Sequence, residues 1–421
     1  MADSYDIVVV GGGIHGVGVA QAAAAAGHSA LLLEKQGLAS GTSGRSSKLI
    51  HGGLRYLESG RLSLVSESLR ERALLLRLAP DLVKLQSVHI PVFRRTRRRP
   101  LLIRAGLSLY AILGHLGKAF RFETVPRSRW GDLDGLITDD LEVVFRYFDG
   151  QTDDARLTTA VMQSAMSLGA ELALPALFHS AELHREGCEV RYLVGGRGNG
   201  GGENAGGGSG AGGADAGQEK TCRARVLVNA AGPWANRILD RITPRQHPMP
   251  IELVQGAHIL VEGGLEHGIY YVESPRDGRA VFVMPRGNKT LVGTTEVRFR
   301  GEDPDDVHAL RCERIYLARV LKRFFPRFLP GGPKQILDAW AGIRVLPARP
   351  GHAFHRSRET ILAVDGHDGA GPPRLLTIYG GKLTTYRSTA AKVMERIAPA
   401  LPSGTPVADT RELSLEPPDA E

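Results

Sequence analysis

The chain has 421 residues, of which 42% are hydrophobic and 23% charged, as in a globular protein with a sizeable core and room for two domains. The three cysteines form no C-x-x-C pair, which excludes a disulfide framework and a zinc site of that kind and favours a reducing, cytoplasmic setting. A net charge of +8 favours an anionic partner: a phosphorylated substrate, a cofactor pyrophosphate, nucleic acid or an acidic membrane surface.

The chain opens with a predicted β-α-β unit, and no secretory leader is expected because the first residues lead directly into the first strand. Residues 5–10 (YDIVVV) indicate a buried parallel strand, 14–26 an alanine-rich helix and 29–34 (SALLLE) a second strand. Gly11, Gly13 and Gly16 form G-x-G-x-x-G between strand and helix, and Glu34 ends the second strand. These glycines let a backbone turn approach a pyrophosphate, and Glu34 can accept hydrogen bonds from a ribose diol. The order strand, glycine motif, helix, strand and acidic residue favours a dinucleotide site over a glycine turn used only for packing. It does not distinguish a nicotinamide from a flavin cofactor.

The middle of the chain changes from helical to strand-like patterns. Helices are expected over 61–80, 101–117 and 154–170, and short strands between 245 and 300 predict an antiparallel sheet. A helix near 304–325, a strand at 375–380 and a final helix near 384–398 follow. The glycine-dominated stretch 195–220 is expected to be a flexible surface insertion at the tip of a hairpin, because it offers little apolar surface to bury.

Two later stretches favour a long dinucleotide cofactor that the chain contacts at several places. VLVNAAGPWAN (226–236) and IYGGKLTTYRSTA (378–390) each bring small residues to a strand-to-helix junction, at Ala230 and Gly232 and at Gly380 and Gly381. Close backbone approach at three places along the chain suits a long cofactor that lies across a discontinuous domain. Packing glycines are the alternative for either stretch alone.

Together the motifs resemble one family. LLLEKQGLASGTSGRSSKLIHGGLRYLE, VNAAGPWA, GAHILV, LVGTTEV, GIRVLP and YGGKLTTYR occur in the order found in the FAD-dependent (aerobic) glycerol-3-phosphate dehydrogenases, over about residues 5–398. The resemblance implies an α/β fold, α+β overall, in which a glutathione-reductase-type Rossmann domain binds non-covalent FAD and an antiparallel sheet forms the substrate domain. The FAD domain is expected over 1–85, 145–245 and 335–400, the cap over 86–144 and 246–334, and a polar tail over 401–421.

The resemblance also implies which residues hold the cofactor. Beyond Gly11, Gly13, Gly16 and Glu34, the expected FAD-binding residues are Thr42, Ser43, Ser46, Ser47, Lys48, Ala230, Gly232, Gly380, Gly381, Leu383 and Thr384.

The implied reaction is oxidation of sn-glycerol 3-phosphate to dihydroxyacetone phosphate by hydride transfer to FAD. The electrons pass to quinone or oxygen. Expected catalytic residues are His51, His258, Arg344 and Lys382, and expected substrate-binding residues are Arg55, Tyr56, Thr294 and Arg358. Either histidine could be the base, since its ordinary pKa of about 6.5 suits proton transfer. Arginine and lysine suit a phosphate dianion.

Three further features leave alternatives open. Six arginines in 93–120 beside an apolar helix predict a peripheral anchor on the inner face of the cell membrane, against a solvated basic face over a core helix. Asp153 and Asp154 resemble a carboxylate pair but are expected to cap a helix. The resemblance implies a C-terminal helical domain in larger family members that this sequence is not expected to include, which leaves a truncation and a naturally short form both open, together with a homodimer.

The main rival function is a related FAD-dependent 2-hydroxy-acid or amino-acid oxidase, which needs a single arginine for its carboxylate. A silent flavin-binding protein and a nicotinamide dehydrogenase are weaker alternatives. Neither nucleic acid nor a metal ion is expected as a partner.

Overall fold

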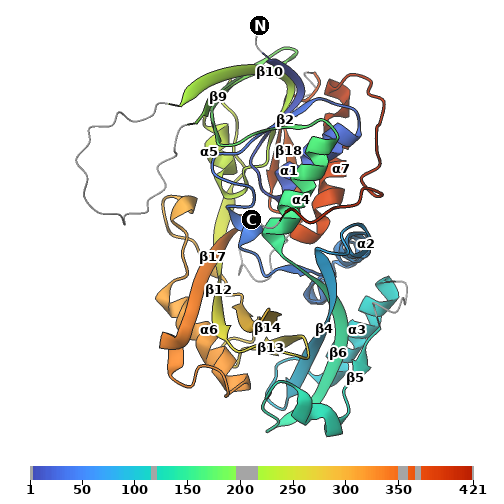
Figure 1. The fold of residues 1–421 in the computed structure, drawn as a ribbon, viewed down its shortest axis with the longest axis vertical. Helices are drawn as coiled ribbons and strands as arrows, with labels where there is room; N and C mark the ends of the chain where they lie inside the picture. Colours follow the sequence, from blue (N-terminus) through green and yellow to red (C-terminus); the bar gives the residue numbers. More distant parts are fainter. Residues whose placement is uncertain (1–2, 115–120, 196–216, 349–358, 366–370, 420–421) are drawn as a thin grey trace, which may run out of the picture.

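The computed structural model describes residues 3–114, 121–195, 217–348, 359–365 and 371–419. These residues form two β-sheets with helices on their faces, one sheet in the upper and one in the lower half of Figure 1. None of the helices in these ranges has the length and apolar character needed to cross a bilayer. The mixed α/β fold class expected from the sequence is confirmed.

The upper sheet has the strand order β11-β8-β9-β10-β1-β2-β7, with β19 paired to β10 and β18 to β19. β7, β2, β1, β10 and β19 pair in parallel, which confirms the opening β-α-β unit. The strands are β1 Asp3–Val10, β2 Ala30–Leu33, β7 Glu171–Ala173, β8 Ala176–His184, β9 Gly187–Val194, β10 Gln218–Asn229, β11 Ile242–Thr243, β18 Ile361–Val364 and β19 Leu375–Tyr379.

Both faces of the upper sheet are buried. Ile7 and Val9 of β1 join a core with α1 (Ile14–Ala25), α4 (Asp154–Ser167) and α7 (Tyr386–Ile397), which lie side by side in Figure 1. Val8 and Val10 point to the opposite core, to which α5 (Ala235–Leu239) also contributes. Successive residues of a strand face opposite ways, so the continuous apolar run YDIVVV is what a strand covered on both faces requires.

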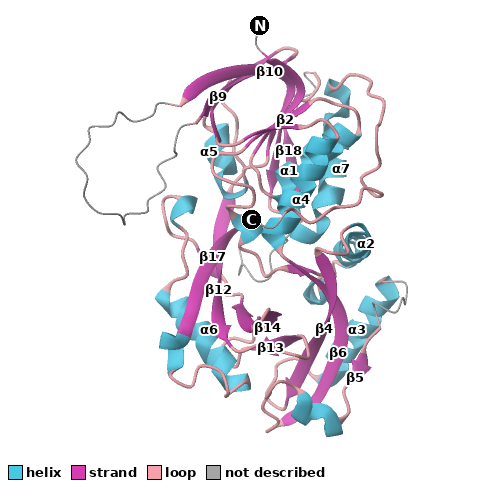
Figure 2. Cartoon of the chain, in the orientation of Figure 1, coloured by secondary structure: helices cyan, strands magenta, loops and turns pink. Residues whose placement is uncertain are grey.

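The lower sheet has the order β16-β12-β15-β14-β13-β4-β6-β3, with β17 paired to β12 and β5 to β6. Figure 2 shows β12 and β17 on one side of the lower half and β4 and β6 on the other. The strands are β3 Leu49–Ile50, β4 Val83–Phe93, β5 Glu123–Thr124, β6 Leu141–Thr152, β12 Ile251–Glu262, β13 Ile269–Glu273, β14 Ala280–Arg286, β15 Lys289–Gly293, β16 Val297–Arg298 and β17 Ile336–Pro347.

Pairing among β12, β13, β14 and β15 is antiparallel, as expected for 245–300. Helix α6 (Arg311–Phe324) covers one core of this sheet, and α2 (Leu62–Leu78) and α3 (Pro100–Leu113) contribute to another. The domain limits expected from the sequence stay a prediction. Short 3-10 helices that bear on the site are η1 Thr42–Gly44, η2 Leu54–Ser59, η5 Gly232–Trp234 and η9 Leu383–Thr385.

Two segments join distant parts of the chain. β9 and β10 pair antiparallel from Val194 and Gln218 onwards, so the glycine-rich stretch does join two strands of a hairpin, although residues 196–216 lie outside the described ranges. The C-terminal segment runs along the upper half: the Val407 amide donates to the Ala25 carbonyl (2.8 Å), and the Leu415 amide donates to the Leu78 carbonyl (2.7 Å).

Candidate active site

The G-x-G-x-x-G loop joins β1 to α1 and leaves no room for a side chain at its last glycine. A Cβ added at Gly16 would lie 1.9 Å from the carbonyl oxygen of Gly11. Helix α1 begins at Ile14 with Gly13 as its N-cap, so the first-turn amides and the positive end of the helix dipole lie next to the loop. The loop is therefore shaped for backbone contact with an anionic group.

Glu34 follows β2 and is 8% exposed. Its carboxylate accepts hydrogen bonds from the backbone amides of Gly12 (2.6 Å) and Gln36 (2.8 Å). These bonds fix a buried acceptor beside the glycine loop, where an acidic residue can bind a ribose diol. The position fits the adenosine end of a dinucleotide.

His15, inside the glycine motif, is a residue that the sequence analysis did not single out. Its ring lies over Gly381, where an added Cβ would be 2.1 Å from Nε2. Burial lowers the pKa of His15 to about 4, which leaves the ring neutral, and its buried Nδ1 has no hydrogen-bond partner in the described part of the chain. A bound dinucleotide could satisfy this nitrogen, so the junction fits FAD. The position of His15 inside the G-x-G-x-x-G motif is the sequence signal that could have identified it.

The predicted cofactor residues that follow β2 are each tied to a different element. The Thr42 hydroxyl donates to the Ile343 carbonyl of β17 (2.6 Å). The Ser43 hydroxyl accepts the Ile14 amide of α1 (2.9 Å). These contacts place the segment between the upper sheet and β17.

Lys48 and Asp154 form a buried ion pair, with 7% and 0% of their side chains exposed. The same carboxylate accepts the amide (2.9 Å) and hydroxyl (2.7 Å) of Ser46. The predicted helix-capping role is therefore wrong for Asp154, because its carboxylate is buried against the Lys48 ammonium. It is confirmed for Asp153, which accepts the Arg156 amide at the start of α4 (3.1 Å).

His258 lies on β12 and is 2% exposed. Its Nε2 is 3.0 Å from the Ser47 hydroxyl, and its ring stacks on Trp340 of β17 with a centroid distance of 6.0 Å. Burial lowers the pKa of His258 to about 3, and the charges of Arg344 and Lys48 contribute. The imidazole is consequently neutral at ordinary pH and a weak proton acceptor.

Arg344 extends from β17 across β12. Its Nη2 donates to the Thr295 carbonyl (2.9 Å) and the Thr294 hydroxyl (3.2 Å). Gly256 makes room for the guanidinium, since a Cβ there would lie 2.0 Å from Nη2. The structure thus brings Arg344, Thr294 and His258 together.

The second group of predicted residues surrounds η2 and η9. The His51 amide donates to the Thr384 hydroxyl (3.1 Å), and the Lys382 ammonium lies 4.0 Å from the centre of the Tyr56 ring. Gly53 adopts a left-handed φ of 75°, which starts η2 and turns the chain towards Arg55 and Tyr56. We call residues 47–56 the substrate segment: Ser47 contacts His258 beside Arg344, and Tyr56 contacts Lys382.

Other predicted residues have simpler positions. Ala230 lies at the end of β10, where its amide donates to the Val10 carbonyl (2.9 Å), and Gly380 has a left-handed φ of 74° after β19. Gly232 begins η5, and Leu383 begins η9. Arg358 lies outside the described residues.

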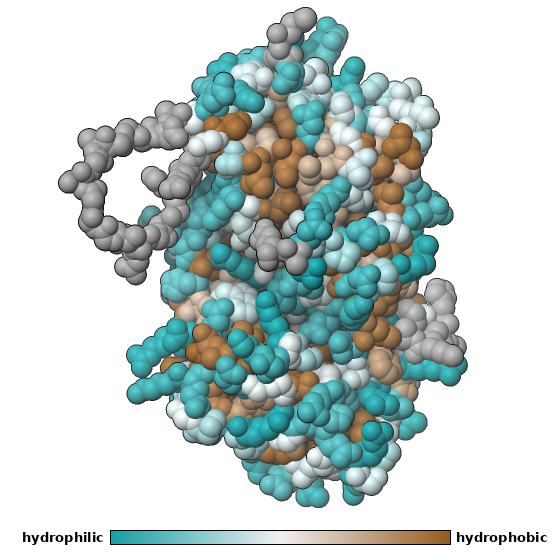
Figure 3. Space-filling model, in the orientation of Figure 1, coloured by the Kyte–Doolittle hydropathy of each residue, from teal (hydrophilic) through white to brown (hydrophobic). Residues whose placement is uncertain are grey.

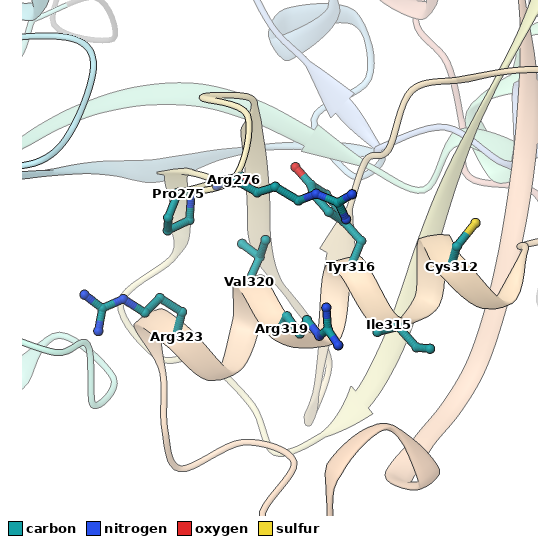
Figure 4. Close-up of a pocket in the computed structure, with 9 residues that line it drawn as sticks. Pro275, Arg276, Cys312, Ile315, Tyr316, Arg319, Val320 and Arg323 are labelled. Atoms are coloured by element: carbon teal, nitrogen blue, oxygen red, sulfur yellow. Dashed lines mark hydrogen bonds between the residues drawn. The ribbon is translucent and has the colours of Figure 1, made fainter.

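A surface pocket of about 500 Å³ lies elsewhere, between α6 and the β13–β14 turn (Figure 4). In this view the Arg276 side chain extends from the turn towards Tyr316, and Cys312 lies on the same helix as Tyr316. None of the predicted site residues lines this pocket. It is not the substrate site that the motifs define.

Comparisons with known proteins identify the family of the chain. A family model described as FAD dependent oxidoreductase matches residues 6–387. The chain is 38% identical over 404 residues to a glycerol-3-phosphate dehydrogenase of Pseudomonas aeruginosa (95% of this chain, 72% of that protein) and 34% identical over 404 residues to D-erythritol 1-phosphate dehydrogenase of Brucella abortus (95% and 75%). The fold is similar to that of the glycerol-3-phosphate dehydrogenase of Bacillus halodurans complexed with FAD, with a TM-score of 0.70, 24% identity and coverage of 98% and 68%.

Replacing Gly16 by alanine should abolish FAD binding, because the new Cβ would collide with the Gly11 carbonyl and displace the loop. The ratio of flavin to protein absorbance in the purified variant measures this loss. Gly37→Ala is the matched control near Glu34, since the nearest atom to its Cβ is 4.0 Å away. A Gly16→Ala protein with full flavin content would contradict the assignment.

Proposed function

Because the chain belongs to the FAD-dependent oxidoreductase family and, within it, to the glycerol-3-phosphate dehydrogenases, we propose that it oxidises sn-glycerol 3-phosphate to dihydroxyacetone phosphate. The observation that carries the proposal is the pair of cations at the two ends of the substrate segment: Arg344 beside His258, and Lys382 over Tyr56. Several fixed cations suit a phosphate dianion, whereas a carboxylate needs one arginine. The glycine loop, Glu34 and the junction of His15 with Gly381 would hold FAD, which would supply the hydride acceptor for carbon 2.

The two histidines have different roles in this proposal. His258 is held neutral by burial and by neighbouring cations, and its Nε2 is hydrogen-bonded to Ser47. It orients the substrate hydroxyl as a neutral hydrogen-bonding group. His51, at the turn of the substrate segment, accepts the hydroxyl proton, and Arg344 stabilises the negative charge that develops on the substrate oxygen.

A four-carbon polyol phosphate is the second candidate substrate. The relative named D-erythritol 1-phosphate dehydrogenase is nearly as similar to this chain as the relatives named for glycerol 3-phosphate. Both substrates present a hydroxyl and a phosphate, so the same cations serve either one.

A membrane quinone is the proposed electron acceptor, because the surface around α3 suits contact with a membrane. Oxygen is the alternative acceptor. Leu101, Leu102 and Ile112 are 81%, 59% and 59% exposed, and Arg94, Arg95, Arg97, Arg99 and Arg104 are exposed near them. Hydrophobic and hydrophilic residues lie side by side at the right edge of the molecule in Figure 3, where Figure 1 places α3. Apolar side chains beside exposed arginines suit the interface of an anionic bilayer.

Anaerobic addition of glycerol 3-phosphate to the purified holoenzyme should bleach the flavin absorbance. Glycerol, which lacks the phosphate, should not bleach it at the same concentration. Bleaching by erythritol 1-phosphate alone would select the second candidate. Bleaching by glycine or lactate, with no response to either phosphate, would overturn the proposal in favour of the oxidase class.

The pH dependence of kcat should separate the histidines. A base with a pKa of about 3, such as His258, stays unprotonated as pH drops from about 8 to 5, so a fall in wild-type kcat over this range is expected only if another group is the base. His51→Gln should lose this dependence and about 10²–10⁴-fold in kcat. His258→Gln should keep it, because the pKa of His258 is about 3. The reverse pattern would identify His258 as the base.

Binding to vesicles that contain anionic lipid should depend on the exposed arginines before α3. Neutralising Arg94, Arg95, Arg97 and Arg99 should reduce co-sedimentation by at least about tenfold, since each basic residue near such a surface contributes about 1 kcal/mol. Arg98 is left intact because it pairs with Glu58 and Glu273. The matched control neutralises four exposed arginines of α6: Arg311, Arg314, Arg319 and Arg323. Equal loss in both variants would contradict a specific membrane face.

A further inference from the structure

A cluster of three buried polar side chains lies directly behind the substrate segment. Arg72 of α2, Tyr110 of α3 and Asp149 of β6 are 0%, 1% and 3% exposed. The Arg72 guanidinium pairs with the Asp149 carboxylate, and its Nη1 also donates to the Phe148 carbonyl (2.7 Å). Three elements that are distant in sequence are thereby joined at one point.

The Tyr110 hydroxyl connects this cluster to the backbone of the substrate segment. It donates to Asp149 Oδ1 (2.8 Å) and accepts the amide hydrogen of Gly52 (3.0 Å). Burial and the adjacent carboxylate raise the pKa of Tyr110 well above its ordinary value, so the phenol keeps its proton and the direction of both bonds is fixed. Asp149 Oδ1 itself lies at 3.4 Å from the Gly52 nitrogen, too far to replace the hydroxyl fully.

Gly52 lies outside any helix or strand, so a side chain and not a backbone ladder holds its amide. A Cβ at this position would lie 2.5 Å from the Tyr110 hydroxyl oxygen and 2.2 Å from Leu69 Cδ2, which explains the glycine. The fixed peptide stands between His51, the proposed base, and the turn that carries Arg55 and Tyr56. A shift of Gly52 would move both groups.

We propose that Tyr110 is a positioning residue: its hydroxyl, held by Asp149 and Arg72, fixes the Gly52 amide and thereby sets the placement of His51 relative to the Arg55–Tyr56 turn. Its part in turnover rests on the proposed function, whereas its effect on the Gly52 backbone does not. Packing alone does not require the hydroxyl, because the neighbours of Tyr110 in this core include the apolar Leu69, Leu107 and Phe145. A phenylalanine would fill the same space.

Tyr110→Phe in the holoenzyme tests the proposal, with Tyr147→Phe as the matched control. The Tyr147 ring packs edge-on against Tyr110 with a centroid distance of 5.8 Å and is also buried, so Tyr147→Phe removes a hydroxyl from the same core. Hydrogen exchange of peptides that span residues 48–60 is measured first, together with flavin content and thermal unfolding. KM and kcat for glycerol 3-phosphate follow.

Tyr110→Phe should raise amide exchange in 48–60 about five- to tenfold and raise KM by a similar factor, which is what one neutral hydrogen bond supplies, while flavin content stays unchanged. Tyr147→Phe should change neither. The positioning proposal would be overturned if amide exchange in residues 48–60 were the same in Tyr110→Phe as in Tyr147→Phe, whichever substrate the enzyme uses. If Tyr110→Phe raises amide exchange in residues 48–60 but glycerol 3-phosphate does not reduce the wild-type flavin, the positioning role is supported and the proposed function is wrong.

The wild-type holoenzyme supplies a second measurement that no folding defect can obscure. The Gly52 amide should exchange slowly although it lies in a loop, because the Tyr110 hydroxyl accepts its hydrogen. Exchange as fast as that of an exposed loop amide would equally overturn the proposal.

Discussion

The buried ion pair between Lys48 and Asp154 is the interaction on which the site depends. It fixes the start of the substrate segment to the helix that packs on the nucleotide sheet, and breaking one partner would leave an uncompensated buried charge, which costs about 3–5 kcal/mol. From that anchor, residues 42–56 contact β17, α1, β12, η9 and α3 in turn. A single peptide thus joins both sheets, so cofactor and substrate groups are held in one frame.

The charged residues around this peptide have two different kinds of contact. Asp154 and Asp149 neutralise the buried cations Lys48 and Arg72, which serve structure. Arg344 donates to the Thr295 carbonyl beside His258, and Lys382 lies over the Tyr56 ring. These two cations flank the substrate segment, where we propose that charge-assisted hydrogen bonds hold the phosphate.

The sequence predicted local elements well and long-range pairing less well. The β-α-β unit, the helices and the antiparallel strands follow from apolar periodicity and glycine position, which are local properties. The partner of Lys48 was missed because Asp154 is 106 positions away and also begins a helix, where capping is the common role. His15 and Trp340 were missed for a similar reason: only the folded chain brings His15 to Gly381 and Trp340 to His258. Burial, which makes His258 a weak base, likewise depends on tertiary packing.

In the proposed function, one frame holds FAD and a polyol phosphate so that carbon 2 of the substrate is oxidised. A single-turnover experiment without oxygen or quinone tests it most directly, with product and reduced flavin quantified in the same sample. We expect one dihydroxyacetone phosphate to form from glycerol 3-phosphate for each flavin that is reduced. Flavin reduction without that product, or product in the absence of flavin reduction, would contradict it.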